Sequence, residues 1–323
     1  MDDGAIMRTY GNTDLPGGTE DRPLVTFALF AYNQEKYIRE AVEGAFSQSY
    51  SPLEIILSDD CSSDRTFEIM EEMAREYRGP HAVKLRQSVQ NRGVIEHINE
   101  VAEKASGAVL VLAAGDDVSF PERTEQLLGV FFIDPEIYAV FSDFNTVNTS
   151  VTIPKKNSTV NSVSLREISF NGGGVGAGAT YAYRKQCFSW PAKLPSSLVS
   201  EDKILPLRAA MLGKVAHLDQ GLIFYRPNLE SLSLLLEATG RFALQRKDHV
   251  HRLIAEIHFA KETGNIGFVD SLACKGGLLV AHYLAGKSSK EPSRHNLPRA
   301  ALMRAISRII RLSIPKRKLL AKT

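Results

Sequence analysis

The chain has 323 residues, of which 44% are hydrophobic and 24% charged, and its formal net charge is +2. These values are typical of a soluble globular protein with one large domain, or one domain and a smaller appendage. The balanced charge gives no reason to propose a nucleic-acid partner, and no apolar run approaches the roughly 20 residues that span a bilayer.

The three cysteines, Cys61, Cys187 and Cys274, are far apart in the sequence. This spacing argues against a zinc site or a disulfide framework and favours a reducing compartment. Residues 1–22 are polar and lack the apolar stretch of a signal peptide, so we expect a flexible leader. Together these features predict a cytoplasmic protein.

From residue 23 to about residue 144, short apolar runs alternate with amphipathic segments. Strands are expected at 24–30, 53–58, 83–87, 108–114 and 138–144. Helices are expected at about 35–48 and 64–77, then one ending near 105 and one opened by Pro121. Repeated strand–helix units predict an α/β fold, with a mostly parallel sheet flanked by helices.

The second half of the chain has a different pattern. Residues 145–161 are polar and should form a surface loop, a cluster with five glycines covers 172–178, and a strand is expected at 180–183. Helices are predicted at 241–261 and 268–285. We therefore expect a sheet domain over 23–228, a helical extension over 229–296 and a separate tail over 297–323.

Two acidic tracts directly follow predicted buried strands. One is Ser58-Asp59-Asp60-Cys61-Ser62-Ser63-Asp64 and the other is Gly115-Asp116-Asp117. Either tract alone could be a turn or a helix cap. Both should lie at the carboxyl edge of the sheet, where open α/β folds bind ligands, and adjacent carboxylates there favour a Mg²⁺ or Mn²⁺ ion with phosphate.

Four motifs occur in an order that is similar to a known family: Phe30-Ala31-Tyr32-Asn33-Gln34-Glu35, Ser47-Gln48-Ser49-Tyr50, the first acidic tract and Gly115-Asp116-Asp117. Over residues 23–226 the chain resembles the family 2 glycosyltransferases, which are inverting enzymes of the GT-A (Rossmann-like) fold. Their donors are nucleotide sugars, here with UDP favoured. Their cofactor is a divalent metal, Mg²⁺ or Mn²⁺.

The resemblance implies roles for individual residues. Tyr32 and Asp60 would hold the nucleoside, with Asn33 beside Tyr32 and looser roles for Phe30 and Glu35. Asp117 would bind the metal, and Asp116 would face the ribose or the water shell of the metal. The Asn91-Arg92-Gly93 segment, otherwise a loop and helix cap, would lie beside the donor through Asn91 and Gly93. Arg226 could represent the family's residue near the donor phosphates, whereas His97 is interpreted as helix packing.

Glu201 and Asp202 precede an apolar helical segment, so they could simply cap that helix, where its dipole favours acids. The family has a Glu-Asp pair at this distance after the metal motif and uses the Asp as its catalytic base. The resemblance therefore assigns that role to Asp202, with Glu201 in reserve. The family also has a flexible loop where the glycine cluster lies, close to the acceptor.

The tail from Leu297 to Thr323 has eight Arg or Lys residues and no Asp or Glu. Its apolar and basic side chains separate on a helical projection. Such a helix suits an anionic membrane surface, giving peripheral contact at the inner face of the membrane, or it could dock on the protein itself. A lipid-linked saccharide acceptor would favour the first interpretation.

The sequence thus predicts a metal-dependent, hexosyltransferase-type glycosyltransferase for polysaccharide or glycan assembly. The partners would be a nucleotide-sugar donor and a saccharide or lipid-linked saccharide acceptor. Phe30-Ala31 and Cys61 depart from the family's usual residues, so an inactive nucleotide-sugar-binding protein stays as the alternative. A sugar-1-phosphate nucleotidyltransferase would need a basic, glycine-rich loop after the first strand, and the chain has Ala31-Tyr32-Asn33-Gln34 there.

Overall fold

The computed structural model describes residues 5–11, 18–19, 22–146, 158–196, 198, 200–226 and 241–288. Within the last range, side chains are described for residues 249–279. The basic tail therefore lies outside the described residues, as do most of the expected leader and part of the 145–161 segment.

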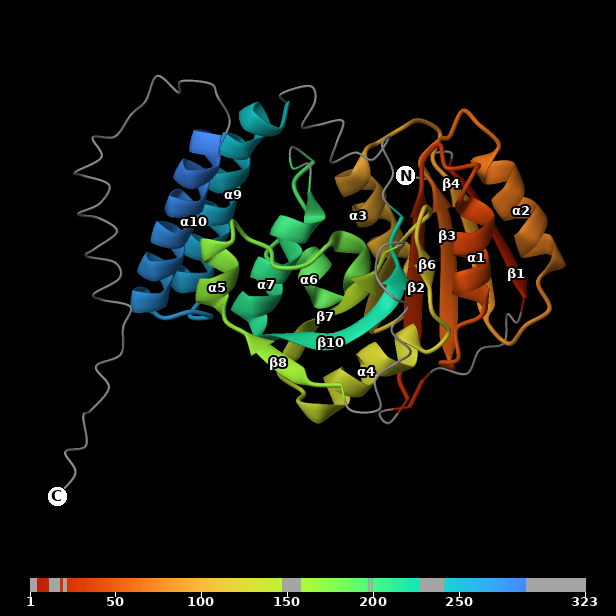
Figure 1. Cartoon of the computed structure of the whole chain (residues 1–323), viewed down its shortest axis with the longest axis horizontal. Helices are drawn as coiled ribbons and strands as arrows, with labels where there is room; N and C mark the ends of the chain where they lie inside the picture. Colours follow the sequence, from red (N-terminus) through yellow and green to blue (C-terminus); the bar gives the residue numbers. More distant parts are fainter. Residues whose placement is uncertain are drawn as a thin grey trace.

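One mixed sheet forms the centre of the molecule (Figure 1), and its strands follow the spatial order β1-β4-β3-β2-β5-β9-β7-β10-β6, with β8 also paired to β10. Strands β4, β3, β2 and β5 run parallel to one another, and β9 lies antiparallel between β5 and β7. The bounds are β1 Ile6–Gly11, β2 Val25–Ala31, β3 Leu53–Asp59, β4 Ala82–Gln87, β5 Val109–Ala114, β6 Val118–Ser119, β7 Ile137–Asn145, β8 Val160–Val163, β9 Tyr181–Arg184 and β10 Lys214–Phe224.

Helices cover both faces of this sheet. Their bounds are α1 Ile38–Phe46, α2 Thr66–Glu76, α3 Val94–Lys104, α4 Arg123–Ile133, α5 Leu165–Phe170, α6 Gln186–Ser189, α7 Leu205–Leu212, α9 Arg241–Glu262 and α10 Phe268–Ser288, with short 3-10 turns η1 Gly178–Thr180 and η2 Glu201–Lys203. One apolar core lies between the sheet and α1, α2 and α4. The other lies between the sheet and α3, α5, α6, α7, α9 and α10.

The predicted α/β fold is confirmed, because each of the five expected strands and the helices between them is present. The continuous apolar runs became central strands because both faces of the sheet are covered. The expected helices at the end of the chain are also present as α9 and α10, which pack against each other and against α5 and α7 in Figure 1.

Four strands differ from the sequence-based expectation: β1, β10, the two-residue β6, and β8, whose first residues were expected in the surface loop 145–161. Residues 6–11, expected within the leader, form β1, which pairs antiparallel with β4 from Ile6↔Gln87 to Gly11↔Ala82. Most of this strand is exposed, which is why its sequence has no buried-strand signal. Strand β10 was not predicted either, since His217, Asp219 and Gln220 interrupt its apolar pattern.

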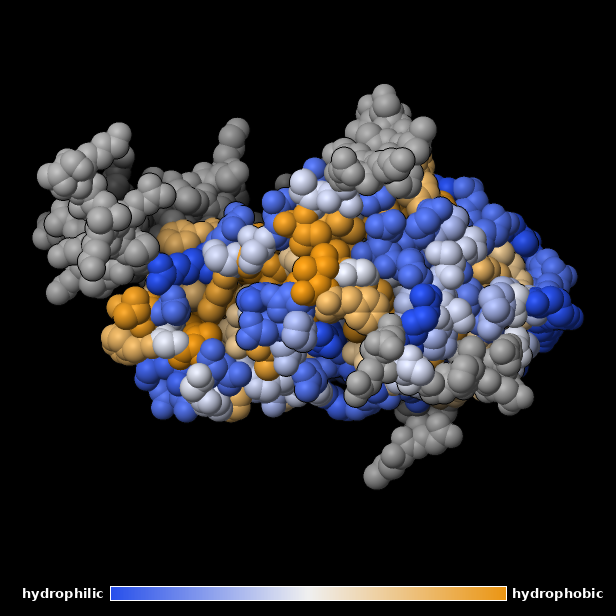
Figure 2. All heavy atoms as spheres, turned by 90° about the horizontal axis from the view of Figure 1, so that it is seen from below, coloured by the Kyte–Doolittle hydropathy of each residue, from blue (hydrophilic) through white to orange (hydrophobic). Residues whose placement is uncertain are grey.

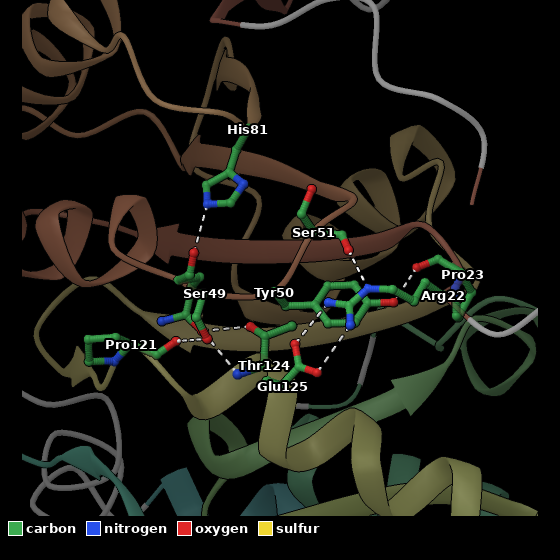
Figure 3. A network of polar contacts seen from close by, with 10 residues as sticks. Arg22, Pro23, Ser49, Tyr50, Ser51, His81, Pro121, Thr124 and Glu125 are labelled. Atoms are coloured by element: carbon green, nitrogen blue, oxygen red, sulfur yellow. Dashed lines mark hydrogen bonds and ion pairs between the residues drawn. The ribbon is translucent and has the colours of Figure 1, made fainter. Parts of the chain in front are cut away.

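The Ser47–Tyr50 motif ties the end of α1 to the start of α4 (Figure 3). The carboxamide oxygen of buried Gln48 accepts hydrogen bonds from the backbone N–H and hydroxyl of Thr124, and its Nε2 donates to the carbonyl oxygens of Gly44 and Phe120. The Tyr50 hydroxyl donates to the carbonyl oxygen of Pro23, as drawn in Figure 3. This network holds residues 120–124, which follow the second acidic tract, against the end of α1.

Apolar residues gather on the surface of the molecule where α10 begins, at the α9–α10 end of the view in Figure 2. Phe268, Val269 and Leu272 are 67%, 51% and 42% exposed. Among the helices that the structure describes, none is long and apolar enough to cross a membrane.

Candidate functional site

The three predicted donor-binding segments meet at the carboxyl ends of neighbouring strands. Strand β2 lies between β3 and β5, with Ala31 opposite Asp59 and Phe30 opposite Ala114. The backbone N–H of Asp60 donates to the carbonyl oxygen of Ala31, and that of Gly115 donates to Phe30. The chain after β2 therefore lies between the two acidic tracts.

The first tract is locked to the loop after β2 by reciprocal hydrogen bonds. The Asn33 carboxamide oxygen accepts from the Ser63 N–H at 2.8 Å, while the Asn33 N–H donates to the Ser62 hydroxyl. The Glu35 carboxylate accepts from the Arg65 N–H at 3.1 Å. These contacts show Asn33 and Glu35 holding the loop in shape, and direct contact between these side chains and a nucleotide stays a prediction.

Asp59 and Asp60 have different surroundings. Asp59 is fully buried, and its carboxylate accepts from the N–H and hydroxyl of Ser62 and from Gln87. Burial raises the pKa of Asp59, with those hydrogen bonds opposing the rise. This carboxylate closes the turn at Cys61, whose φ of 63° lies in the left-handed region.

Asp60 reaches across to the loop before α3. Its two carboxylate oxygens accept from the N–H groups of Arg92, at 3.0 Å, and Gly93, at 2.8 Å. The Gly93 N–H also lies 3.0 Å from the carboxamide oxygen of Asn91. The structure thus brings together Asp60, Asn91 and Gly93, three of the predicted donor-binding residues.

Two aromatic side chains border this region. Tyr32 is 46% exposed, so its ring is available to a ligand. The half-buried Phe30 ring lies edge-on to His97, with centroids 5.1 Å apart. His97 is buried and its Nε2 lies 2.6 Å from the hydroxyl of Ser58, which agrees with its interpretation as a packing residue.

In the second acidic tract, Asp117 is buried and Asp116 is partly exposed. The carboxylate of Asp117 accepts a 3.0 Å hydrogen bond from the backbone N–H of Arg226. Burial raises the pKa of Asp117 to about 7; the Arg226 N–H opposes the rise and the charge of Asp116 adds to it. A buried carboxylate of this kind gains stability from a nearby cation.

The donor set at Asp116 and Asp117 fits a hard divalent ion only together with phosphate oxygens. Across the described residues, no cluster of three or more His, Cys, Asp or Glu side chains could hold a metal. Mg²⁺ commonly takes one or two carboxylates plus substrate phosphates, and two carboxylates are present here. The residues therefore fit a metal that arrives with a diphosphate.

Two arginines flank Asp117. The guanidinium of Arg226 pairs with Glu40 and lies 5.6 Å from the ring centre of Tyr37. Arg123, which the sequence analysis did not identify, is fully buried and donates to the carbonyl oxygen of Leu112 at 2.7 Å and to that of Ala179. The sequence feature that could have identified Arg123 is its position as a single arginine at the start of a largely apolar helix.

Glu201 and Asp202 lie on η2, against the glycine cluster. A Cβ on Gly178 would lie 1.9 Å from Glu201 Oε1, and one on Gly174 would lie 1.9 Å from the Asp202 carbonyl oxygen. The cluster is therefore glycine-rich because its backbone packs directly on the two acids. Since Gly178 is adjacent to Ala179, this packing also connects the acids to Arg123 and, through Arg123, to the second tract.

The two acids differ in their hydrogen bonds. The carboxylate of Asp202 accepts from the Ser200 hydroxyl, and its Oδ2 lies 3.9 Å from Lys203 Nζ. Burial, together with the charge of Asp202, raises the pKa of Glu201 to about 7. The protonated form of Glu201 is therefore favoured relative to that of an exposed glutamate.

Comparison with known proteins gives consistent matches. Residues 26–188, just over half of the chain, match the family model described as Glycosyl transferase family 2. The chain is 36% identical over 104 residues to the putative glycosyltransferase EpsE of Bacillus subtilis, covering 32% of this chain and 37% of EpsE. It is 30% identical over 110 residues to the putative teichuronic acid biosynthesis glycosyltransferase TuaG of the same organism, covering 34% of this chain and 42% of TuaG. The matches span less than half the length of these relatives.

Solved structures support the fold. S. aureus TarS 1-349 in complex with UDP-GlcNAc is similar with a TM-score of 0.63 and 18% sequence identity, covering 89% of this chain and 81% of that one. The mannosyltransferase PcManGT from Pyrobaculum calidifontis, in complex with GDP-Man and Mn²⁺, has a TM-score of 0.50 and 16% identity, covering 92% and 83%.

Proposed function

Because this chain belongs to glycosyltransferase family 2, we propose that it transfers a sugar from a nucleoside diphosphate sugar, with UDP favoured, to an acceptor hydroxyl. The observation that carries the proposal is the meeting of the loop after β2 with both acidic tracts. The UDP-GlcNAc complex of TarS supports the donor class. The similarity to TuaG, a putative teichuronic acid biosynthesis glycosyltransferase, supports a role in surface polysaccharide assembly.

In the proposed reaction, the acceptor hydroxyl attacks the anomeric carbon on the face opposite the leaving diphosphate. A new glycosidic C–O bond forms as the bond to the diphosphate breaks, and the bonding electron pair leaves with the diphosphate. Asp202 takes the proton from the attacking hydroxyl as general base. Attack from the opposite face inverts the configuration at the anomeric carbon.

Asp117, with Asp116 beside it, would hold the divalent metal together with the diphosphate oxygens. When bound, such an ion supplies positive charge against the charge that develops on the departing diphosphate. The backbone N–H of Arg226 keeps the Asp117 carboxylate oriented, and Arg123 keeps the neighbouring chain in place. Asp60, Asn91 and Gly93 would form the nucleoside side of the site.

A ligand screen by thermal unfolding tests the donor class, since a ligand that binds only the folded state raises the unfolding midpoint. UDP and UDP-sugars with Mn²⁺ should raise the midpoint more than GDP does. A larger shift with GDP would contradict the UDP preference. The control variant is Asp143→Asn, which changes an exposed carboxylate paired with His217. Its unfolding midpoint should shift with each ligand as that of the native protein does.

Release of UDP from UDP-GlcNAc separates the enzyme from the alternative, an inactive nucleotide-sugar-binding protein. The alternative is favoured by Cys61, which occupies a left-handed conformation that glycine adopts more readily. We expect slow Mn²⁺-dependent UDP release with water as acceptor. Tight UDP binding without release from any UDP-sugar would support the binding protein.

Peripheral membrane contact through residues 297–323 is also proposed, on the basis of the eight basic residues there. Each such charge contributes about 1 kcal/mol near an anionic surface. Flotation with vesicles containing phosphatidylserine should carry the full chain but not a chain ending at residue 296. Equal flotation of both chains would exclude the tail as the contact.

A further inference from the structure

Helix α9 and the segment that holds Asp202 both lie beyond residues 26–188, which match the family model, and Leu253 of α9 and Ile204, which follows that segment, belong to one apolar core. A Cβ on Gly173 would lie 2.9 Å from Leu253 Cδ1 of α9 and 2.2 Å from the carbonyl oxygen of Lys203. The glycine cluster is therefore held between α9 and η2. Described side chains of α9 near this contact therefore lie close to the segment that holds Asp202.

His249 lies one helical turn before Leu253 and on the same face of α9. It is 9% exposed, and neither ring nitrogen has a hydrogen-bond partner among the described residues. Asp202 and Lys203 are the charged groups that act on the ring: burial lowers the pKa of His249 to about 4, Asp202 opposes this and Lys203 adds to it. At neutral pH the imidazole is uncharged, with one N–H to donate.

A buried imidazole with two unpartnered nitrogens costs free energy, because burial removes water without replacing its hydrogen bonds. We therefore infer that the imidazole of His249 gains a hydrogen-bond partner when substrate is bound. In the free protein the Asp202 carboxylate instead accepts from the Ser200 hydroxyl. A general base must turn an oxygen towards the acceptor, and a second donor can then hold the carboxylate in that orientation.

We propose that His249 is a positioning residue, whose neutral N–H donates to the Asp202 carboxylate when an acceptor occupies the site. The inference rests on the proposed function, since it takes Asp202 as the base. It adds that the C-terminal helices complete the active site. The role requires a hydrogen-bond donor at position 249 and not a charge.

The first test compares His249→Leu with His249→Gln, because leucine fills the space without a donor and glutamine keeps an N–H. UDP release from UDP-GlcNAc with Mn²⁺ is the measured reaction, since the base also acts on water. His249→Leu should lower kcat about tenfold, less than the roughly 100-fold or more expected for loss of the base itself, with KM for the donor unchanged. His249→Gln should recover most of kcat. His251→Leu, at an exposed position of α9, should behave as the native protein.

Equal kcat losses in the leucine and glutamine variants would overturn the inference, because they would indicate packing alone. Unchanged kcat in His249→Leu would also overturn it. If the leucine variant does not fold, His249→Met replaces it in the comparison. The double variant His249→Leu/Asp202→Asn should be no slower than Asp202→Asn alone if His249 acts through Asp202.

A second measurement does not depend on turnover. With UDP-GlcNAc and Mn²⁺ present and water as the acceptor, the ring ¹⁵N resonances of His249 should differ between Asp202→Asn and the native protein. The matched reference is His217, whose resonances should move in Asp143→Asn because His217 Nε2 lies 2.8 Å from Asp143 Oδ1. Unmoved His249 resonances in Asp202→Asn would refute the proposed contact. Full UDP release by Asp202→Asn would instead refute the proposed base, so the two failures are distinguishable.

Discussion

Arg208 of α7 and Glu256 of α9 form a buried ion pair that docks the C-terminal helices on the sheet domain. Arg208 Nη2 lies 2.6 Å from Glu256 Oε1, and its Nε lies 2.9 Å from Oε2. The same guanidinium donates to the carbonyl oxygens of Cys187 and Ala192. Because Asp202 lies just before α7 and His249 lies on α9, this pair fixes their relative positions.

Glu256→Ala should therefore destabilise the protein strongly. Removing one partner leaves the Arg208 charge buried and uncompensated, which costs about 3–5 kcal/mol. Urea unfolding measures the loss. Glu262→Ala on the same helix removes an exposed carboxylate paired with Lys261, so its cost should be small compared with that of Glu256→Ala. Similar values for the two variants would show that the buried pair does not hold α9.

Asp202→Asn should abolish transfer while leaving the nucleotide bound. An amide cannot take the proton of the acceptor, so we expect a loss of about 100-fold or more in UDP release. Calorimetry should find the affinity for UDP unchanged, since Asp202 and the Asp60 region belong to different segments. Glu201→Gln is the matched control. If it alone abolished release, Glu201 would be the base.

Gly174→Ala should impair transfer through a purely steric effect. The new Cβ would meet the Asp202 carbonyl oxygen at 1.9 Å, so η2 must move. A displacement of about 1 Å near a reacting group can cost about 100-fold in rate. Gly129→Ala has nothing within 4 Å of the new Cβ and should retain the native rate. Native UDP release by Gly174→Ala would contradict this account of the glycine cluster.

His97 should make stability fall in mild acid. Burial and Arg86 lower the pKa of His97 to about 3, whereas the unfolded side chain titrates near 6.5. The unfolded chain therefore binds more protons between these values, and stability is lost as pH falls below about 6.5. The linkage relation gives a loss of about 2 kcal/mol between pH 7.5 and pH 5.

Urea unfolding at the two pH values measures this loss. In His97→Gln the loss should shrink by that amount, whereas the exposed His251→Gln should keep the native pH dependence. An unchanged pH dependence in His97→Gln would show that other groups cause the acid loss.

The sequence predicts the parts of the molecule whose signals are local. Buried parallel strands such as Leu53–Asp59 have continuous apolar runs, and Pro121 marks the start of a helical segment, so the α/β order could be predicted. The meeting of the acidic tracts also follows from strand order, because carboxyl ends of parallel strands share an edge. Their roles with nucleotide and metal stay predictions.

Other features depend on contacts between distant segments and have no local signal. Arg123 binds the carbonyl oxygen of Ala179, and Leu253 of α9 lies against Gly173 beside η2. The resemblance implies a flexible loop at the glycine cluster, yet at Gly173, Gly174 and Gly178 the missing Cβ makes room for the backbone or side chain of η2. Such long-range pairings become visible only once the helices are packed.

Strand β1 has a consequence for the solution behaviour of the chain. It occupies the hydrogen-bonding edge of β4, and Arg8 on it pairs with Glu71 of α2. A chain beginning at residue 18 would leave the N–H and C=O groups of β4 open to another copy, which is a route to edge-to-edge association. Size-exclusion chromatography should show such a chain self-associating as its concentration rises. Residues 6–11 thus protect the edge of β4 from pairing with another copy of the chain.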